Sequence, residues 1–483
     1  MSIELGYNQD MLRTFSLRRY VEHTIIIISL MSVVFLPRIL VGWWYFGQAQ
    51  AYAAQGSNIK ATYNYEDAAH RLWWRAGLFE QAALSAWQGG DVPGALRLFE
   101  IALQKNGLSS IGKLTLGDIY SKSGDISEAI ATWESVGFGT LDSANAFSRL
   151  ATAERLMGNY GLAMQHWQTV LKIEPQNGEA HYNLGLYLMT FQPLDALPEL
   201  MLALTTNPEL DEQVQVLRKG LNLASLQDDN AYQLVLSGRS LGSIGAWDLA
   251  LEAFMKASIE DPFFSEAWAW QGEADQHLGK DGLPALNKAL ELDKNSIMSL
   301  ALIGLYYRRL DQIDQAWSVY VRAATLDPTN SAWQEVLGEL SAQKGDLIDA
   351  LMYYQQAVDL SPQNPNSWRA LAVFCVQYNV NIADTGLHAA LQAIKLEPES
   401  WRSQDVMGQV YMAKGDLVNA SIYFDLSIEI APDEPESYLH LGYLKLLQDQ
   451  RDDAYDNLVN ARRLDPDGSI GWQAQRLLDQ YFP

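Results

Sequence analysis

The sequence predicts an all-α protein built as a solenoid of stacked helical hairpins. The first observation is a residue pattern that returns about every 34 residues, a period typical of helical repeats. One unit and the next hold Gly304, Tyr307, Ala316, Tyr320, Ala323 and Pro328, then Gly338, Ser341, Ala350, Tyr354, Ala357 and Pro362. The second observation is the length of 483 residues, which exceeds what one hydrophobic core normally supports. Finally, 48% apolar residues exclude wholesale disorder.

Each unit contains the residues that a helical hairpin needs. Glycine and alanine let two helices approach closely, and aromatic side chains fill the space beside them. Proline closes a unit, because it ends the second helix or begins the next one. Gly-Asp or Gly-Asn pairs suit the turn between two helices, and they occur at 90–91, 124–125, 158–159, 345–346 and 415–416.

The pattern recurs roughly ten times and resembles the tetratricopeptide repeat (TPR) family over nearly all of residues 76–467. Two of the better matches hold Gly238, Gly245, Ala250, Phe254, Ala257 and Pro262, and Gly408, Tyr411, Ala420, Phe424 and Pro432. The resemblance implies a right-handed superhelical solenoid whose inner groove binds peptides. The hairpin around 90–91 departs from the family pattern because its first helix lacks the Leu-Gly pair.

The pattern and the composition divide the chain into five parts. The repeat array covers 65–467 and contains an extra helix near 209–230, and a capping helix covers 468–483. We expect residues 1–23 to be a cytoplasmic tail, 24–46 a transmembrane anchor and 47–64 a polar spacer.

The anchor prediction rests on the strongly apolar stretch 24–46. As a helix it spans about 34 Å, enough to cross a hydrocarbon core of about 30 Å. Trp43, Trp44 and Tyr45 follow at its far end, where amphipathic rings favour the headgroup layer. A cleavable signal peptide is the alternative, because small residues follow at 49–53. Within the stretch, Arg38 either reaches the outer headgroups or pairs with an acidic residue of a membrane partner.

The basic residues around this stretch predict its orientation. Arg13, Arg18 and Arg19 precede it, whereas Lys60 is the first basic residue after it. Because positive charge stays on the cytoplasmic side, we expect the N-terminus in the cytoplasm and the repeats outside it. The protein is then a single-pass membrane protein.

Several kinds of chemistry find no support in the residues. Asp and Glu outnumber Lys and Arg by 58 to 34, and this balance argues against nucleic acid as the partner. The histidines are dispersed, so we expect no metal site and no cofactor. No phosphate-binding glycine loop and no nucleophile motif occurs, and Cys375 falls at a packing position. We therefore expect no enzymatic activity.

The resemblance places a partner-binding groove on the first helices of the hairpins. In this register the groove-facing positions mix both signs of charge rather than forming one basic cradle. They hold Tyr182, Arg239, Glu273, Arg308, Glu335, Glu339, Arg369 and Asp405.

The leading functional hypothesis is a membrane-anchored scaffold that recruits or assembles proteins of an envelope or membrane complex. A second hypothesis is binding of a carbohydrate or another polymer, because 15 Trp and 23 Tyr could stack on sugars. A third is a non-catalytic subunit of a machinery that synthesises or exports glycans. The sequence leaves the partner and the oligomeric state open.

Overall fold

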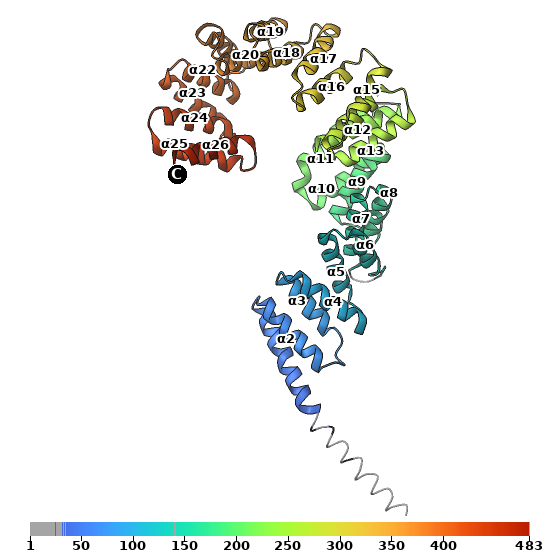
Figure 1. The fold of residues 1–483 in the computed structure, drawn as a ribbon. Helices are drawn as coiled ribbons and strands as arrows, with labels where there is room; N and C mark the ends of the chain where they lie inside the picture. Colours follow the sequence, from blue (N-terminus) through green and yellow to red (C-terminus); the bar gives the residue numbers. More distant parts are fainter. Residues whose placement is uncertain (1–24, 26–30, 32, 34, 140–141, 483) are drawn as a thin grey trace, which may run out of the picture. The chain divides into compact units, whose positions relative to one another are not determined.

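The computed structural model describes residues 25, 31, 33, 35–139 and 142–482 (Figure 1). These residues form helices joined by short turns, without a strand, and the prediction of an all-α repeat solenoid is confirmed for them. The chain divides into two compact units, Met1–Leu221 and Asn222–Pro483.

The N-terminal unit contains a helical segment over residues 35–54 and a series of paired helices. Helices α2 to α10 pack against their neighbours in sequence, so that the hairpins are stacked. Its elements are α2 (Asn58–Arg71), α3 (Leu78–Gln88), α4 (Val92–Asn106), α5 (Ser110–Ser123), α6 (Ile126–Glu134), α7 (Ser143–Leu156), α8 (Tyr160–Ile173), α9 (Gly178–Phe191), η1 (Pro193–Asp195), α10 (Ala196–Thr206), η2 (Pro208–Leu210) and α11 (Asp211–Ala224).

Helix α11 occupies the stretch where the sequence predicts an extra helix, and the second unit begins near its end. It buries Val214, Leu217 and Leu221, which lie three or four residues apart on one helix face.

The C-terminal unit continues the alternation of first and second helices and ends on α26. Its elements are α12 (Asn230–Ser243), α13 (Trp247–Glu260), α14 (Ser265–His277), α15 (Leu283–Leu292), α16 (Ile297–Arg309), α17 (Ile313–Leu326), α18 (Ser331–Lys344), α19 (Leu347–Leu360), α20 (Pro365–Gln377), η3 (Ile382–Gly386), α21 (Leu387–Leu396), α22 (Trp401–Ala413), α23 (Leu417–Ile430), α24 (Pro435–Leu447), α25 (Arg451–Leu464) and α26 (Ser469–Tyr481).

In several hairpins the repeated glycine of the first helix lies against an aromatic ring of the second helix, and in others it lies against a leucine. A Cβ at Gly304 would come within 2.4 Å of Cζ of Tyr320, and one at Gly408 within 2.6 Å of Cδ1 of Phe424. No side chain fits at such a distance, so glycine is needed for the two helices to pack. Cys375 is also part of this core, as predicted, and burial raises the pKa of its thiol to about 11.

The turns also use the residues that the sequence offers. Gly124 adopts a φ of 89° and closes α5, a conformation that side chains other than glycine rarely adopt. Asp91 accepts a hydrogen bond from the backbone nitrogen of Gly94 at 3.0 Å and so caps the start of α4.

The region before the repeats differs from the expected spacer. Residues 47–54 continue the helix of 35–46, and α2 begins at Asn58. This helix packs against α2, and Phe46 and Ala49 are buried in the same cluster as Tyr65 and Leu72. The stretch 47–64 is therefore part of the folded unit rather than a linker, because its apolar face finds a partner in α2.

Among the described residues, no helix is long and apolar enough to span a bilayer. The predicted anchor 24–46 includes residues 24, 26–30, 32 and 34, which lie outside the described residues, as does the predicted tail 1–23. Arg38 does lie within them, and its Nη2 donates a hydrogen bond to the backbone oxygen of His70 at 3.1 Å. The partner of this guanidinium group is thus a carbonyl of the same chain.

Candidate functional site

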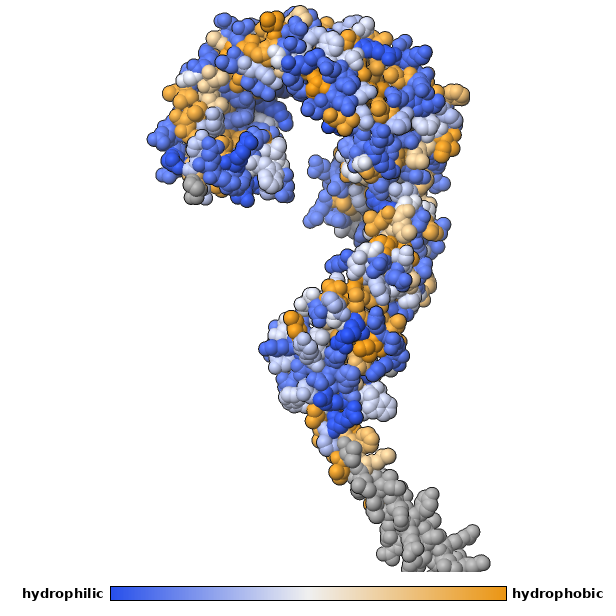
Figure 2. Space-filling model, viewed as in Figure 1, coloured by the Kyte–Doolittle hydropathy of each residue, from blue (hydrophilic) through white to orange (hydrophobic). Residues whose placement is uncertain are grey.

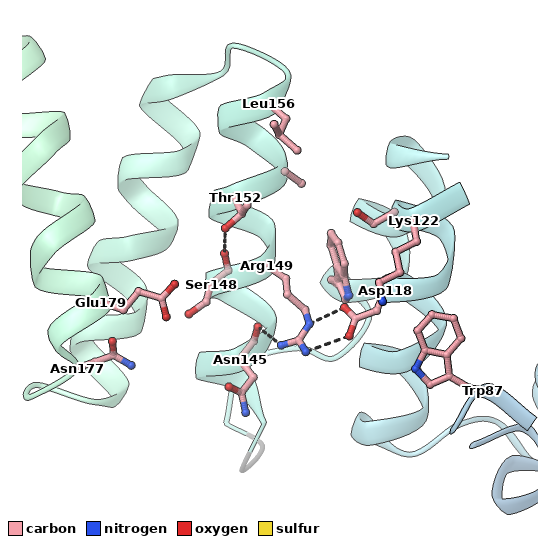
Figure 3. A pocket seen from close by; sticks show the side chains of 13 residues that line it. Trp87, Asp118, Lys122, Asn145, Ser148, Arg149, Thr152, Leu156, Asn177 and Glu179 are labelled. Carbon is pink, nitrogen blue, oxygen red and sulfur yellow. Dashed lines mark hydrogen bonds and ion pairs between the residues drawn. The ribbon is translucent and has the colours of Figure 1, made fainter. Parts of the chain in front are cut away.

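A cavity of about 490 Å³ opens on the first helices of the N-terminal unit (Figure 3). The first helices α3, α5, α7 and α9 contribute most of its lining. Helix α6 adds Trp133, and Asn177 precedes α9. The lining residues are Trp87, Asp118, Ser121, Lys122, Trp133, Asn145, Ser148, Arg149, Thr152, Ala153, Leu156, Asn177 and Glu179.

An ion pair between α5 and α7 forms the middle of this cavity. Nε and Nη2 of Arg149 donate to the two carboxylate oxygens of Asp118 at 2.6 and 3.0 Å, and Nη1 donates to the backbone oxygen of Asn145 at 3.2 Å. A bidentate pair of this kind holds both side chains in one geometry. Because its hydrogen bonds are used within the unit, the pair shapes the cavity rather than offering a free charge.

The two ends of the cavity carry opposite charges. At one end the ammonium group of Lys122 lies over the ring of Trp87, 4.8 Å from its centroid, and at the other end is Glu179 (Figure 3). Both charged side chains are exposed and, within the described part of the chain, neither forms an ion pair. They are therefore available to a ligand that carries both signs of charge.

Polar and apolar groups lie between these ends. Asn145 is exposed on α7, and its side-chain amide has no hydrogen bond to another described residue. An amide can both donate to and accept from a peptide backbone. Leu156, with 73% of its surface exposed, offers an apolar contact at the end of the same helix. The cavity thus combines the contacts that an extended peptide can use.

The predicted groove residues of the C-terminal unit are placed differently. Arg308 of α16 donates to Glu339 of α18 at 2.6 Å, and Ser367 of α20 donates to Glu335 of α18. Each contact joins the first helices of two successive hairpins. These side chains therefore connect repeats to one another instead of pointing freely into a groove.

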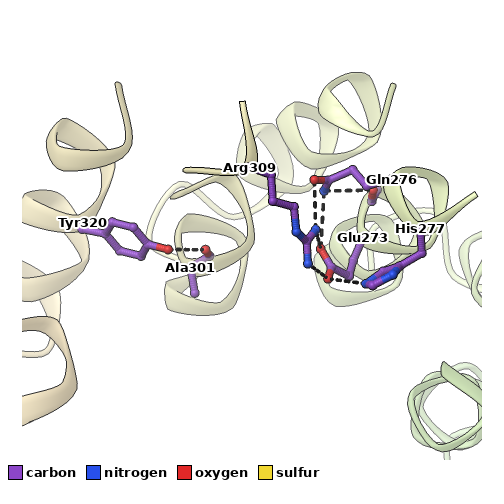
Figure 4. A network of polar contacts seen from close by, with 7 residues as sticks. Glu273, Gln276, His277, Ala301, Arg309 and Tyr320 are labelled. Atoms are coloured by element: carbon purple, nitrogen blue, oxygen red, sulfur yellow. Dashed lines mark hydrogen bonds and ion pairs between the residues drawn. The ribbon is translucent and has the colours of Figure 1, made fainter. Parts of the chain in front are cut away.

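Glu273 is the centre of another of these connections (Figure 4). Its carboxylate is only 6% exposed and accepts hydrogen bonds from both terminal nitrogens of Arg309, at 2.7 and 2.8 Å. It also lies 3.2 Å from Nε2 of His277. The hydrogen bond to Glu273 raises the pKa of Arg309. Glu273 is thus a buried structural carboxylate that joins α14 to α16.

Arg369 and Asp405 are buried in the same way. Arg369 of α20 donates to Glu397 at 2.8 Å and to Oγ of Ser403 at 2.9 Å, and 11% of its side chain is exposed. Asp405 of α22 is 3% exposed and pairs with Nδ1 of His440 on α24 at 3.0 Å.

Two further predicted groove residues also contact other side chains. Tyr182 of α9 donates to the side chain of Gln213 on α11 at 3.1 Å, and burial raises the pKa of its hydroxyl. Arg239 of α12 lies 3.5 Å from Glu266 and stacks over the ring of Trp270. None of the eight predicted residues lines the cavity of the N-terminal unit.

Sequence reasoning therefore missed the lining residues of that cavity. A signal was present, because Asp118 and Arg149 are opposite charges 31 residues apart. Arg308 and Glu339 have the same separation and also form a pair. This spacing equals one repeat of about 34 residues minus one helical turn. A search for opposite charges at this spacing therefore finds contacts between successive first helices.

The stacked hairpins define the class of this molecule as an all-α helical-repeat protein, and its N-terminal unit carries a polar cavity on the first helices. Among the described residues, no three potential ligands gather as a metal site requires.

The family models identify the kind of repeat. A model described as TPR repeat matches residues 151–190, and models described as tetratricopeptide repeat match residues 80–136, 302–365 and 402–434. These matches support the tetratricopeptide repeat family for the array. Proteins of this family mediate protein–protein interactions and the assembly of complexes, and they are usually non-catalytic.

Individual relatives are distant. The "Protein CTR9 homolog" of Arabidopsis thaliana is 26% identical over half of this chain and 23% of its own length. The "TPR repeat-containing protein MJ1428" of Methanocaldococcus jannaschii is 23% identical over 66% of this chain and 63% of its own length. The chain thus spans less than two thirds of each relative. The solved structure of yeast Tom70 matches at 16% identity and a TM-score of 0.43, covering 83% of this chain and 94% of that one.

Proposed function

We propose that this protein is a membrane-anchored scaffold that binds an extended segment of a partner protein in the cavity of its N-terminal unit. The observation that carries the proposal is the cavity itself, which is open to solvent and contains polar groups with no partner in the described part of the chain. Its volume of about 490 Å³ lies in the range of ligand sites. A protein partner also agrees with the activity of the repeat family.

The charges at the two ends of the cavity give the bound segment a direction. An acidic side chain of the partner would approach Lys122, and a basic one would approach Glu179 (Figure 3). Between them, Asn145 and Ser148 are placed to exchange hydrogen bonds with the peptide backbone. Complementary charges at fixed positions provide specificity and orientation more than raw affinity.

The membrane part of the proposal rests on sequence. The apolar stretch 24–46 is long enough to span a bilayer, and Arg13, Arg18 and Arg19 precede it. We propose one span with the N-terminus in the cytoplasm and the repeats outside, where the scaffold would assemble proteins of an envelope or membrane complex. Two of the tryptophans, Trp133 and Trp167, are buried packing residues and offer no support for the alternative of carbohydrate binding.

Panning the full chain in detergent against a library of random linear peptides tests the binding site. We expect enriched peptides to carry an acidic residue, and Lys122→Glu should abolish binding of those peptides. Lys172→Glu is the matched control, because it makes the same charge change on α8, outside the cavity. Peptides that bind Lys122→Glu as well as the unaltered chain would contradict the proposed site.

Proteolysis tests the topology independently. A protease added outside intact cells should digest the repeats and leave the tail before residue 24 protected. Full protection of the repeats would contradict the proposed orientation without affecting the peptide site.

A further inference from the structure

An aromatic and basic surface surrounds the junction between the N-terminal helical segment 35–54 and the turn that follows α2. Gly42 of the segment lies against the turn, since a Cβ there would come within 2.7 Å of Cγ of Leu72. Arg38 donates to the backbone oxygen of His70. The turn at residues 72–76 is therefore held beside residues 38–46 of the helix.

Large apolar side chains at this junction are exposed although they lie beside a folded core. Trp73 and Trp74 of the turn are 71% and 49% exposed, and their rings meet edge to face at 5.9 Å. On the helix, Leu40 is 61% and Trp44 is 59% exposed. Figure 2 shows apolar side chains gathered at the N-terminal end of the described helix. Exposed apolar patches of this kind mark surfaces that contact a membrane or a partner protein.

The same surface carries positive charge in a chain of net charge -24. The guanidinium group of Arg75 lies over the rings of Phe46 and Trp43, at 4.0 and 4.7 Å, and within the described residues it has no carboxylate partner. Arg38 also lacks one there, whereas Arg71 pairs with Asp67 at 2.6 Å. Tryptophan rings beside unpaired guanidinium groups match the boundary between acyl chains and lipid phosphates.

We infer that the turn at residues 72–76 is a second membrane contact, in which Trp73 and Trp74 enter the headgroup layer beside the anchor. This inference rests on the proposed anchoring by residues 24–46. A helical anchor that begins at Thr24 would rise about 28 Å by Trp43, which would bring Trp43 to the far edge of the hydrocarbon core. Because the turn packs beside Gly42, its two tryptophans lie at the same level. The first hairpin then lies against the membrane surface, and this contact restricts its rotation relative to the anchor.

Depth-dependent fluorescence quenching in the full chain tests the inference. The chain is reconstituted in vesicles of phosphatidylcholine with some phosphatidylglycerol, with Cys375→Ala as background. An environment-sensitive fluorophore is placed at Leu40→Cys in the helix, Ala76→Cys in the turn or Phe138→Cys, a 70% exposed site farther along the same unit. Lipids spin-labelled at the headgroup are the quencher.

We expect the fluorophores at positions 40 and 76 to lose most of their intensity, and the one at 138 to keep it. Trp73→Ser combined with Trp74→Ser should restore the fluorescence at position 76 and leave quenching at position 40 unchanged. Trp472→Ser, which removes a 68% exposed ring elsewhere, is the control substitution. Circular dichroism of the double variant checks that it is folded.

The outcomes separate the two proposals. Quenching at position 40 without quenching at position 76 overturns this inference and leaves the anchor in place. Absence of quenching at both positions overturns the anchor and this inference together. If the double substitution leaves position 76 fully quenched, the tryptophans are not the contact and the inference is wrong.

Discussion

In the N-terminal unit the first helices leave a cavity of about 490 Å³ between them, whereas those of the C-terminal unit are joined by successive polar contacts. The repeat pattern is the same in both. The difference lies in which charged side chains of the first helices have a partner in the neighbouring repeat. In the first unit Lys122 and Glu179 remain without ion pairs among the described residues. In the second, Glu273 pairs with Arg309 and Asp405 pairs with His440.

This comparison shows that one repeat scaffold can use the same helix face for two purposes. Charges that pair with the next repeat stiffen the stack, and charges without such a partner are available for a ligand. A charged residue on a first helix is therefore no indication of binding until its partner in the neighbouring repeat is known.

Glu273→Ala should have the largest effect on stability. It leaves Arg309 without its carboxylate, and we expect a loss of about 2–3 kcal/mol, below the 3–5 kcal/mol of a fully buried pair because Arg309 is partly exposed. Asp118→Ala in the first unit, with both partners about one third exposed, should cost about 0–1 kcal/mol. Hydrogen exchange of α14 and α16, or of α5 and α7, measures each loss. Equal losses would contradict the distinction between the units.

Ala316→Leu tests the packing that both units share. Ala316 is fully buried between helices, so the larger side chain should overpack the hairpin by about 1–3 kcal/mol. Gln315→Leu, at the exposed neighbouring position, should change the free energy of unfolding by less than about 0.5 kcal/mol. Urea denaturation followed by circular dichroism compares the two, and a tolerated Ala316→Leu would show that the hairpin is loosely packed.

Arg308→Ala and Glu339→Ala should each have a small effect. Their pair is 2.6 Å long but partly exposed, so each change should cost about 0.2–1 kcal/mol. The double variant should lose little more than either single one, because both changes remove the same contact. Neither should alter peptide binding in the N-terminal cavity. Weakened binding would place the functional groove in the C-terminal unit instead.

The pH dependence of the C-terminal unit should be the smallest effect, because it involves one partly exposed imidazole. Burial opposes the charged form of His440, but the charge and hydrogen bond of Asp405 prevail and raise its pKa above 6.5. The pair therefore contributes its full stabilisation at pH values below the pKa that His440 has in the unfolded chain. This stabilisation is lost as the pH rises through the pKa of His440 in the folded chain. Hydrogen exchange of α22 and α24, followed as the pH is raised through the pKa of His440, measures this loss of stability. Asp405→Asn should remove this pH dependence of stability. If the pH dependence persists in the variant, another titratable group causes it.

The sequence alone determined the repeat, its helices and its core. The recurring glycine and aromatic positions predict close helix contacts because only glycine leaves room for a ring, as between Gly304 and Tyr320. Cys375 was likewise predicted as a core residue, since it falls at a packing position of a first helix. These inferences succeed because each unit folds against its immediate neighbours, so that local spacing reports the contacts.

Only the tertiary structure decided which charges are free and what the N-terminal helix touches. Arg308 and Arg309 are adjacent, yet one pairs with the following hairpin and the other with the preceding one, because consecutive helical side chains point in different directions. Phe46 and Ala49 form a buried face only because α2 packs beside them. Such contacts join residues about one repeat apart. They depend on how two helices are placed against each other, and the residue spacing within either helix does not specify that placement.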